Sequence, residues 1–309
     1  MKLKKLLHLN FRKENMQVKS TPIARALAAK LGVDISQVKG SGFDGKVLYE
    51  DVKNFSPAAA ATQPVAASAS ATAAPQVGAY SEAVKPIRKA IAKAMTNSWS
   101  NVAYTNLVHR VNMTKLWDLR SSIKDSLLKS EDVKITFLPF ILKAVSVALK
   151  EFPLFSAKYN EAKSTLDFPG VINLGFAVDT EAGLMVPVIK NANALSVLDL
   201  AREVSRLASA ARNKTIKPDD MKNAGFTVTN YGSVGSLWGV PVINYPELAI
   251  LGVGAIQDEA FVEKGTLVAG KVMYLTVAAD HRWIDGADVG RFASRVKQLL
   301  ESPELLGVY

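Results

Sequence analysis

The sequence contains three histidines, His8, His109 and His281, and no cysteine among its 309 residues. Histidine is the side chain whose ordinary pKa suits proton transfer near neutral pH. The lack of cysteine excludes disulfides, thiolate metal ligands and a cysteine nucleophile together. Three histidines cannot form a metal site without several carboxylates, so no metal is expected. The composition therefore favours general acid–base chemistry at a single histidine.

His281 has the setting of a candidate base. It lies in the segment 280–286, directly after the continuous apolar run VMYLTVAA at 272–279. Such a run is typical of a strand buried on both faces, and its end places His281 at the rim of a core, beside a turn. A partly buried histidine near a carboxylate is a credible base, and a core histidine satisfied by backbone groups is the alternative. His8, in a basic tail, and His109, in an alternating segment, are interpreted as non-catalytic.

The elements that position His281 belong to a mixed α/β domain beginning at about residue 81. Apolar residues three or four positions apart indicate helices, and alternating or continuous apolar runs indicate strands. Thr114 and Ser196 are expected to cap the helices that follow them. The predicted helices are 85–99, the segment after Thr114, 137–149, 198–212 and the segment after Asp285, and the predicted strands are 104–113, 171–178, 184–190, 226–231, 248–256 and 271–279.

The N-terminal part of the chain predicts a separate small module. Thr21 and Pro22 are typical of the start of a helix, and Gly32 is typical of its end. A glycine-containing loop and a second short helix within 48–55 follow. The next segment is rich in Ala and Pro and nearly uncharged, as in a flexible linker. The predicted organisation is a basic tail at 1–19, a two-helix module at 20–55, a linker at 56–80 and an α/β domain at 81–309.

The net charge of +10 is concentrated near the N-terminus, where residues 1–55 contain 11 Lys and Arg against 5 Asp and Glu. This excess predicts an acidic protein partner; nucleic acid is disfavoured because no aromatic residues alternate with the charges. No apolar run approaches the length of a membrane span, so a cytoplasmic protein is expected, or a mitochondrial-matrix one in a eukaryote. The residues expected to bind the partner are Arg25, Lys30, Lys39 and Lys46.

Several segments carry a family resemblance. The string Asp-His-Arg-x-x-Asp-Gly at 280–286 is joined by residues 226–256 and 175–193, and residues 21–52 precede them. Together the first three resemble the signature segments of the dihydrolipoamide acyltransferases of 2-oxo-acid dehydrogenase complexes. Residues 21–52 resemble the peripheral subunit-binding domain of that family, and module, linker and catalytic domain occur in the family's order.

The resemblance implies a two-layer α/β sandwich with a mixed sheet, as in chloramphenicol acetyltransferase, preceded by the two-helix module. It implies that His281 takes the proton from the thiol of coenzyme A or dihydrolipoamide, because a thiol with a pKa of about 8.5 is mostly protonated at neutral pH. It implies that Thr229 donates to the oxyanion, although the residues alone indicate an ordinary strand position. Asp285 matches the acidic position of the motif, with either a catalytic role or a structural one that holds the turn through an arginine.

The resemblance also implies homotrimers with active sites between subunits, assembled into a 24- or 60-subunit core. The implied partners are dihydrolipoamide dehydrogenase and the pyruvate decarboxylase component, and the implied reaction is acetyl transfer between a lipoyl group and coenzyme A. No Asp-Lys-Ala tripeptide occurs, so the lipoyl group is expected in trans, and Gly235-Ser236 replaces the family's usual Gly-Gly. The alternatives are succinyl or branched-chain transfer, an antibiotic acetyltransferase, and a non-catalytic scaffold.

Overall fold

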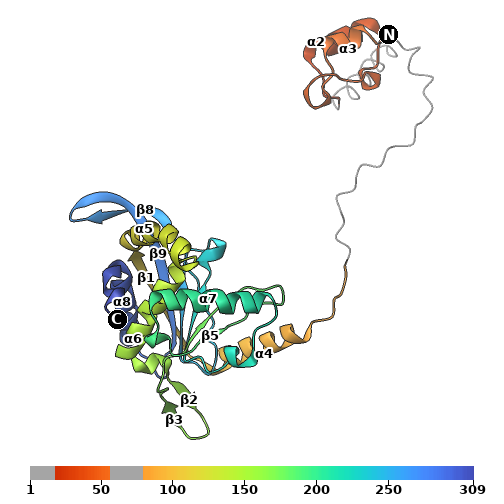
Figure 1. Cartoon of the computed structure of the whole chain (residues 1–309). Coiled ribbons are helices and arrows are strands. Elements are labelled where there is room, and N and C mark those ends of the chain that lie inside the picture. The colour runs from red at the N-terminus through yellow and green to blue at the C-terminus, as the bar shows by residue number, and fades with distance from the viewer. Residues whose placement is uncertain (1–17, 56–78) are drawn as a thin grey trace. The chain divides into compact units, whose positions relative to one another are not determined.

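The computed structural model describes residues 18–55 and 79–309. The chain divides after Ser81 into two compact units (Figure 1). Each unit has its own hydrophobic core. The tail predicted at 1–19 and the linker predicted at 56–80 lie almost wholly outside the described residues.

The N-terminal unit contains the two predicted helices, α2 (Pro22–Leu31) and α3 (Tyr49–Lys53). The Thr21 hydroxyl accepts a hydrogen bond from the backbone N–H of Ala24 at 3.2 Å, as expected of an N-cap. Gly32 ends α2 in the left-handed conformation, with φ of 68°. The core of this unit consists of Ala24, Ala28, Ile35, Val38, Val47 and Val52.

The C-terminal unit consists of a sheet covered by helices. The helices are α4 (Pro86–Asn101), α5 (Thr114–Glu131), α6 (Phe137–Glu151), α7 (Val197–Arg212) and α8 (Gly286–Glu301). The strands are β1 (Tyr104–Asn112), β2 (Lys158–Asn160), β3 (Thr165–Asp167), β4 (Leu174–Phe176), β5 (Val188–Ile189), β6 (Phe226–Asn230), β7 (Ala249–Val253), β8 (Gln257–Glu263) and β9 (Thr266–Asp280).

The main sheet is mixed. Its strand order is β1-β9-β7-β6-β4-β5, and β8 forms a hairpin with the first part of β9. Strands β4, β6 and β7 are parallel to one another, while β1, β5 and β9 are antiparallel to their neighbours. Strands β2 and β3 form a separate hairpin. The long strand β9 therefore links the hairpin at one end of the sheet to the turn that carries His281 at the other.

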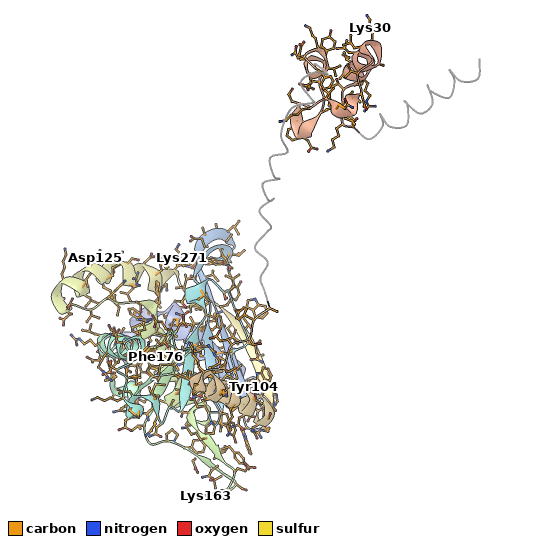
Figure 2. The ribbon with its side chains drawn as sticks, turned by 90° about the vertical axis from the view of Figure 1, so that its right-hand side faces the viewer. Lys30, Tyr104, Asp125, Lys163, Phe176 and Lys271 are labelled. Carbon is orange, nitrogen blue, oxygen red and sulfur yellow. The ribbon has the colours of Figure 1, made fainter. Side chains whose placement is uncertain are left out.

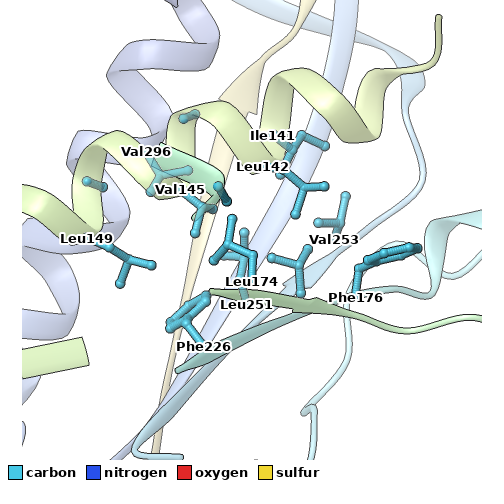
Figure 3. Packing of buried hydrophobic residues seen from close by; sticks show 14 of the residues in the cluster. Ile141, Leu142, Val145, Leu149, Leu174, Phe176, Phe226, Leu251, Val253 and Val296 are labelled. Atoms are coloured by element: carbon cyan, nitrogen blue, oxygen red, sulfur yellow. The ribbon is translucent and has the colours of Figure 1, made fainter. Parts of the chain in front are cut away.

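Helix α6 occupies the centre of the core, with α7 and α8 packed beside it. Its residues from Pro139 to Leu149 are buried on all sides, which explains its continuous apolar sequence. Each large apolar side chain buried here contributes about 1.5–3 kcal/mol. The predicted two-layer α/β fold with a mixed sheet is confirmed. Figure 3 shows α6 over the sheet, with Ile141, Leu142, Val145 and Leu149 near Leu174, Phe176, Phe226, Leu251 and Val253.

Some local expectations were wrong. Thr114 does not cap α5; it is the first helical residue, and its hydroxyl donates to Asn112 Oδ1 at 2.7 Å. The strands expected at 171–178 and 184–190 shrink to β4 and β5, because Pro187 lacks the N–H that would extend the pairing. By contrast, Ser196 caps α7 through a capping box, as predicted. None of the described helices combines the length and apolar composition needed to cross a membrane.

Candidate active site

His281 lies on the turn that follows β9, as the apolar run predicts. Its backbone N–H donates to the carbonyl of Ala103 at 2.7 Å, and the carbonyl of Asp280 accepts from the N–H groups of Trp283 and Ile284 at 3.0 Å each. The imidazole is exposed rather than partly buried in the single chain. The backbone of the turn is therefore fixed, while the side chain that would take up a proton faces outward.

Asp280 and Arg282 form the ion pair that stabilises this turn. The Asp280 side chain is 1% exposed, and its two oxygens accept from Arg282 Nε at 3.0 and 3.1 Å and from Arg282 Nη2 at 2.6 Å. These hydrogen bonds raise the pKa of Arg282. Asp280 Oδ1 also accepts from the N–H of Ala103 at 3.3 Å, which ties the turn to the start of β1. The arrangement is a bidentate pair with one partner desolvated.

Asp285 was expected either to take part in catalysis or to hold the turn through an arginine, and among the described residues the pair that holds the turn is Asp280 with Arg282. Asp285 is the exposed N-cap residue of α8, and its carboxylate makes no capping hydrogen bond. Among the described residues it forms no ion pair within 4.0 Å, whereas Asp280 pairs with Arg282. The burial of Asp280 explains the difference, because a desolvated carboxylate needs a compensating cation more than an exposed one does.

An aromatic stack that sequence analysis missed supports the turn from another element. The ring of Trp283 lies on that of Tyr159 in the β2–β3 hairpin, with centroids 4.5 Å apart and planes inclined by 27°. Arg282 also lies over the Trp283 ring, with its Cζ atom 5.8 Å from the ring centroid. Such pairs add roughly 0.5–1.5 kcal/mol beyond the area that they bury. The stack joins residues far apart in the chain, so no local pattern signals it.

Thr229 lies near the end of β6 and is half-buried. Tyr231, two residues later, donates from its hydroxyl to Thr276 Oγ1 on β9 at 3.0 Å, and its ring packs against Gly252 on β7. A Cβ at Gly232 would lie 2.3 Å from the backbone of Gly254, so only glycine fits there. These contacts fix the chain immediately after Thr229.

Ser236 lies in the same loop, where the family usually has glycine. Gly235 needs the left-handed conformation, with φ of 85°, but Ser236 does not have a positive φ. The backbone carbonyl of Ser236 accepts from the N–H of Ala255 at 2.8 Å. The N–H of Ser236 donates to the carbonyl of Tyr231 at 3.3 Å, so the serine is accommodated without backbone strain and its side chain is exposed.

Thr229 and His281 lie at opposite ends of the sheet. The register runs from Thr229 to Gly252 to Thr276, and His281 follows Thr276 by five residues along β9. At about 3.3 Å per residue this separation is roughly 17 Å along the strand alone. Figure 2 marks the His281 end by Tyr104, which pairs with Asp280, and an earlier position on β9 by Lys271. One copy of the chain therefore cannot bring both side chains to the same atom of a bound molecule.

Glu247 is a buried carboxylate that sequence analysis did not single out. It accepts from Thr227 Oγ1 and from Asn244 Nδ2, both at 2.7 Å. Burial raises its pKa to about 7, against the weaker opposing effect of these bonds. Since Thr227 precedes Thr229 by two residues on β6, the cluster ties this strand to the loop before β7. A cavity of about 400 Å³ beside α4 has Glu247 in its wall but neither Thr229 nor His281.

We predict that Glu247→Gln changes the pH dependence of stability. The folded-state pKa is raised from 4.5 to about 7, so the native protein binds the extra proton and loses stability as pH rises between these values. The loss is roughly 3 kcal/mol and is complete above about pH 7. Thermal unfolding from pH 5 to 8.5 should show the stability of the variant rising relative to that of the wild type as pH rises. Lys158, the charged neighbour of Glu247, is the same in both proteins. A difference independent of pH would contradict this assignment.

The remaining candidates take no part in this arrangement. His109 is half-buried on β1, and burial, followed by the charge of Lys297, lowers its pKa. The described residues contain no group of three His, Asp or Glu side chains that could hold a metal ion. The four basic residues expected to bind a partner are all exposed, and none forms an ion pair with another described residue. They are Arg25, Lys30, Lys39 and Lys46.

Comparison with known proteins identifies both units. A profile of the catalytic domain of 2-oxoacid dehydrogenase acyltransferases matches residues 78–308, and a profile of an E3 binding domain matches residues 18–53. The dihydrolipoyllysine-residue acetyltransferase component of the pyruvate dehydrogenase complex of Acholeplasma laidlawii is 45% identical over 303 residues. This match covers 94% of the chain and 56% of the relative, so the chain spans little more than half of that protein.

Two solved structures resemble the C-terminal unit. The dihydrolipoamide acetyltransferase of Azotobacter vinelandii is 32% identical with a TM-score of 0.72, covering 74% of this chain and 94% of that one. In that enzyme a serine, a histidine 52 residues later and an asparagine four residues further on have been studied for their role in the catalytic mechanism. The cubic core of a pyruvate dehydrogenase multienzyme complex is 33% identical with a TM-score of 0.71, covering 75% and 96%. The chain belongs to the 2-oxoacid dehydrogenase acyltransferase family.

Proposed function

We propose that the protein is a dihydrolipoamide acetyltransferase of a pyruvate dehydrogenase complex. It transfers an acetyl group between the thiol of a dihydrolipoyl group and coenzyme A. The observation that carries the proposal is the spacing of three side chains. Thr229, His281 and Asp285 are separated by 52 and 4 residues, as are the serine, histidine and asparagine of the Azotobacter enzyme. The hydroxyl groups of Thr229 and of the Azotobacter serine can each donate one hydrogen bond.

The proposed chemistry needs a base and an oxyanion donor. His281 takes the proton of the attacking thiol, so that the thiolate forms as it attacks the thioester carbonyl. The carbonyl oxygen becomes an oxyanion, and the Thr229 hydroxyl donates to it. Collapse of the tetrahedral intermediate expels the second sulfur, which receives the proton from the imidazolium of His281. Asp285, four residues after the base at the start of α8, is proposed as a positioning residue.

The proposed site is formed between two copies of the chain. The separation of about 17 Å along β9 prevents Thr229 and His281 of one copy from meeting at one thioester. A rotational assembly brings the His281 end of one copy to the Thr229 end of the next, and a closed ring of such contacts satisfies every copy. We propose a trimer as this ring and its further assembly into a 24- or 60-subunit core. The similarity to a cubic core structure supports this proposal.

We propose that residues 20–55 act as a docking module for dihydrolipoamide dehydrogenase, the pyruvate decarboxylase component, or both. Residues 56–80 are the proposed linker and residues 81–309 the proposed catalytic domain. The match to an E3 binding domain supports the docking role. The 309 residues contain no Asp-Lys-Ala tripeptide, so the lipoyl group is proposed to come from a lipoyl domain that lies outside them.

Binding of the partner enzyme should depend strongly on salt. The exposed cations of the module act through screened Coulomb attraction, so raising salt from about 50 to about 500 mM should weaken the affinity at least tenfold. Isothermal titration of the full chain at several ionic strengths measures this. Lys46→Ala should reduce the salt dependence, while Lys53→Ala is the matched control, because Lys53 already lies 3.9 Å from Glu50. An affinity that does not change with salt would exclude electrostatic docking.

Acetyl transfer is tested with acetyl-CoA and free dihydrolipoamide, followed by thioester absorbance. Turnover should be seen with acetyl-CoA and be much slower with succinyl-CoA or a branched-chain acyl-CoA. Separately produced lipoyl domains, including one fused to the dehydrogenase component, then test delivery in trans. Turnover of free dihydrolipoamide without acetylation of any lipoyl domain would refute delivery in trans alone. No turnover of either acceptor would refute the proposed activity.

A further inference from the structure

Phe43 is the most exposed large apolar side chain among the described residues, at 98%. It lies in the loop between α2 and α3 and contributes nothing to the core of the module, which consists of six other side chains. Single exposed apolar residues are common at protein surfaces. Phe43 differs because the backbone that carries it is held in place from several sides.

Backbone contacts close the loop around Phe43. The N–H of Gly42 donates to the carbonyl of Lys46 at 2.9 Å, and the N–H of Gly45 donates to the carbonyl of Gly42 at 3.0 Å. A Cβ at Gly40 would lie 2.3 Å from the carbonyl oxygen of Gly45, so this close approach requires glycine. The loop is therefore a tight, internally bonded turn with Phe43 at its tip.

Side chains fix the same loop from outside. The Asp51 carboxylate accepts from the N–H groups of Ser41 at 2.9 Å and Leu48 at 2.8 Å, and these bonds lower its pKa. Asp44, directly after Phe43, has φ of 57° and forms an ion pair with Lys19. A non-glycine residue in the left-handed region costs free energy, and here the surrounding contacts hold it there. The conformation that exposes Phe43 is thus built into the loop.

A fixed, exposed aromatic side chain is suited to binding another protein. It offers a large apolar area with few rotatable bonds, so little side-chain entropy is lost when a partner covers it. Aromatic residues are enriched among the few interface positions that carry most of the binding energy. Lys39 and Lys46 are exposed in the same loop segment, and their charge favours an acidic surface around the pocket that receives the ring.

We propose that Phe43 is the apolar anchor of the docking module. The ring enters an apolar pocket on dihydrolipoamide dehydrogenase, and acidic residues at the rim of that pocket face Lys39 and Lys46. This inference rests on the proposed docking function of residues 20–55. Phe43 supplies the short-range part of the affinity, whereas Lys39 and Lys46 supply long-range attraction.

The test compares the full chain with Phe43→Ala in binding to the dihydrolipoamide dehydrogenase encoded in the same genome, measured by surface plasmon resonance at several salt concentrations. The variant should bind roughly 30-fold more weakly or worse, mostly through a faster dissociation rate. Its salt dependence should equal that of the wild type. Phe43→Trp should retain most of the affinity, because an aromatic ring still fills the pocket.

Leu31→Ala is the matched control, since Leu31 is an exposed apolar residue of the same module, on α2, and should change the affinity less than twofold. Phe43→Ala should leave thermal unfolding unchanged, because the side chain is outside the core. An affinity of Phe43→Ala within twofold of the wild type would overturn the anchor. If the wild-type chain itself fails to bind, the docking function is wrong and the anchor with it.

Discussion

Replacing His281 by alanine should lower kcat by about two to four orders of magnitude, the contribution typical of a positioned general base. The other histidine among the described residues, His109, cannot substitute, because it is held on β1 beside α8 and its pKa is lowered by burial. The fold should be retained, since the imidazole is exposed and the turn is held by backbone bonds and by the Asp280–Arg282 pair. Steady-state kinetics with acetyl-CoA and dihydrolipoamide measures the effect.

His109→Gln is the control for His281→Ala. It removes a second imidazole from the same domain without touching the candidate site, and kcat should stay within a few-fold of the wild type. The pH profile gives an independent check, because loss of the base removes the limb that reports its ionisation. Retention of most of the activity by His281→Ala would contradict the proposed mechanism.

Replacing Thr229 by alanine should lower kcat about 100- to 1,000-fold, the loss typical of one oxyanion donor. KM should change little, because the hydroxyl bonds the carbonyl oxygen most strongly once that oxygen carries charge. Stability should also change little, since Thr229 is only half-buried and Tyr231 and Thr227 hold its strand.

Thr229→Ser is the matched variant, since it keeps the hydroxyl and restores the residue type found at this spacing in the Azotobacter enzyme. It should keep most of the activity. Thr229→Val keeps the shape without the donor and should resemble alanine. Equal kinetics for serine, valine and alanine would show that the hydroxyl makes no contribution to the transition state.

Local sequence chemistry predicted much of the fold. Thr21 and Ser196 cap their helices because a hydroxyl satisfies an N–H at the helix start wherever the helix is packed. The continuous apolar run before His281 placed that residue at the end of a buried strand, and the turn is there. These signals lie within a few residues of the feature that they predict. They do not depend on the order of strands in the sheet.

What could not be predicted depends on long-range contacts. Strand β8 was missed because its charged, exposed residues lack a buried face and gain their order from pairing with β9. The stack of Tyr159 on Trp283 joins residues from separate elements. The burial of Asp280 and its pairing with Arg282 depend on the packing around the turn, which the motif does not encode.

The strand order has the largest consequence for function. Thr229 lies within one apolar strand sequence and His281 follows another, and neither local pattern fixes the distance between them. The register through Gly252 and Thr276 instead separates them along the sheet. A single copy therefore holds only one half of each proposed site, and we expect catalysis to require the assembly. Loss of the contact between copies would remove activity even where every copy stays folded.

Each proposed site takes His281 from one copy and Thr229 from the next. The most direct measurement is the activity of an assembly formed by coexpressing His281→Ala chains with Thr229→Ala chains and purifying them together. With random mixing in a ring, about a quarter of the sites pair an intact His281 with an intact Thr229, so activity should return to about a quarter of the wild-type value. Activity equal to the average of the two separate variants would contradict a site shared between copies.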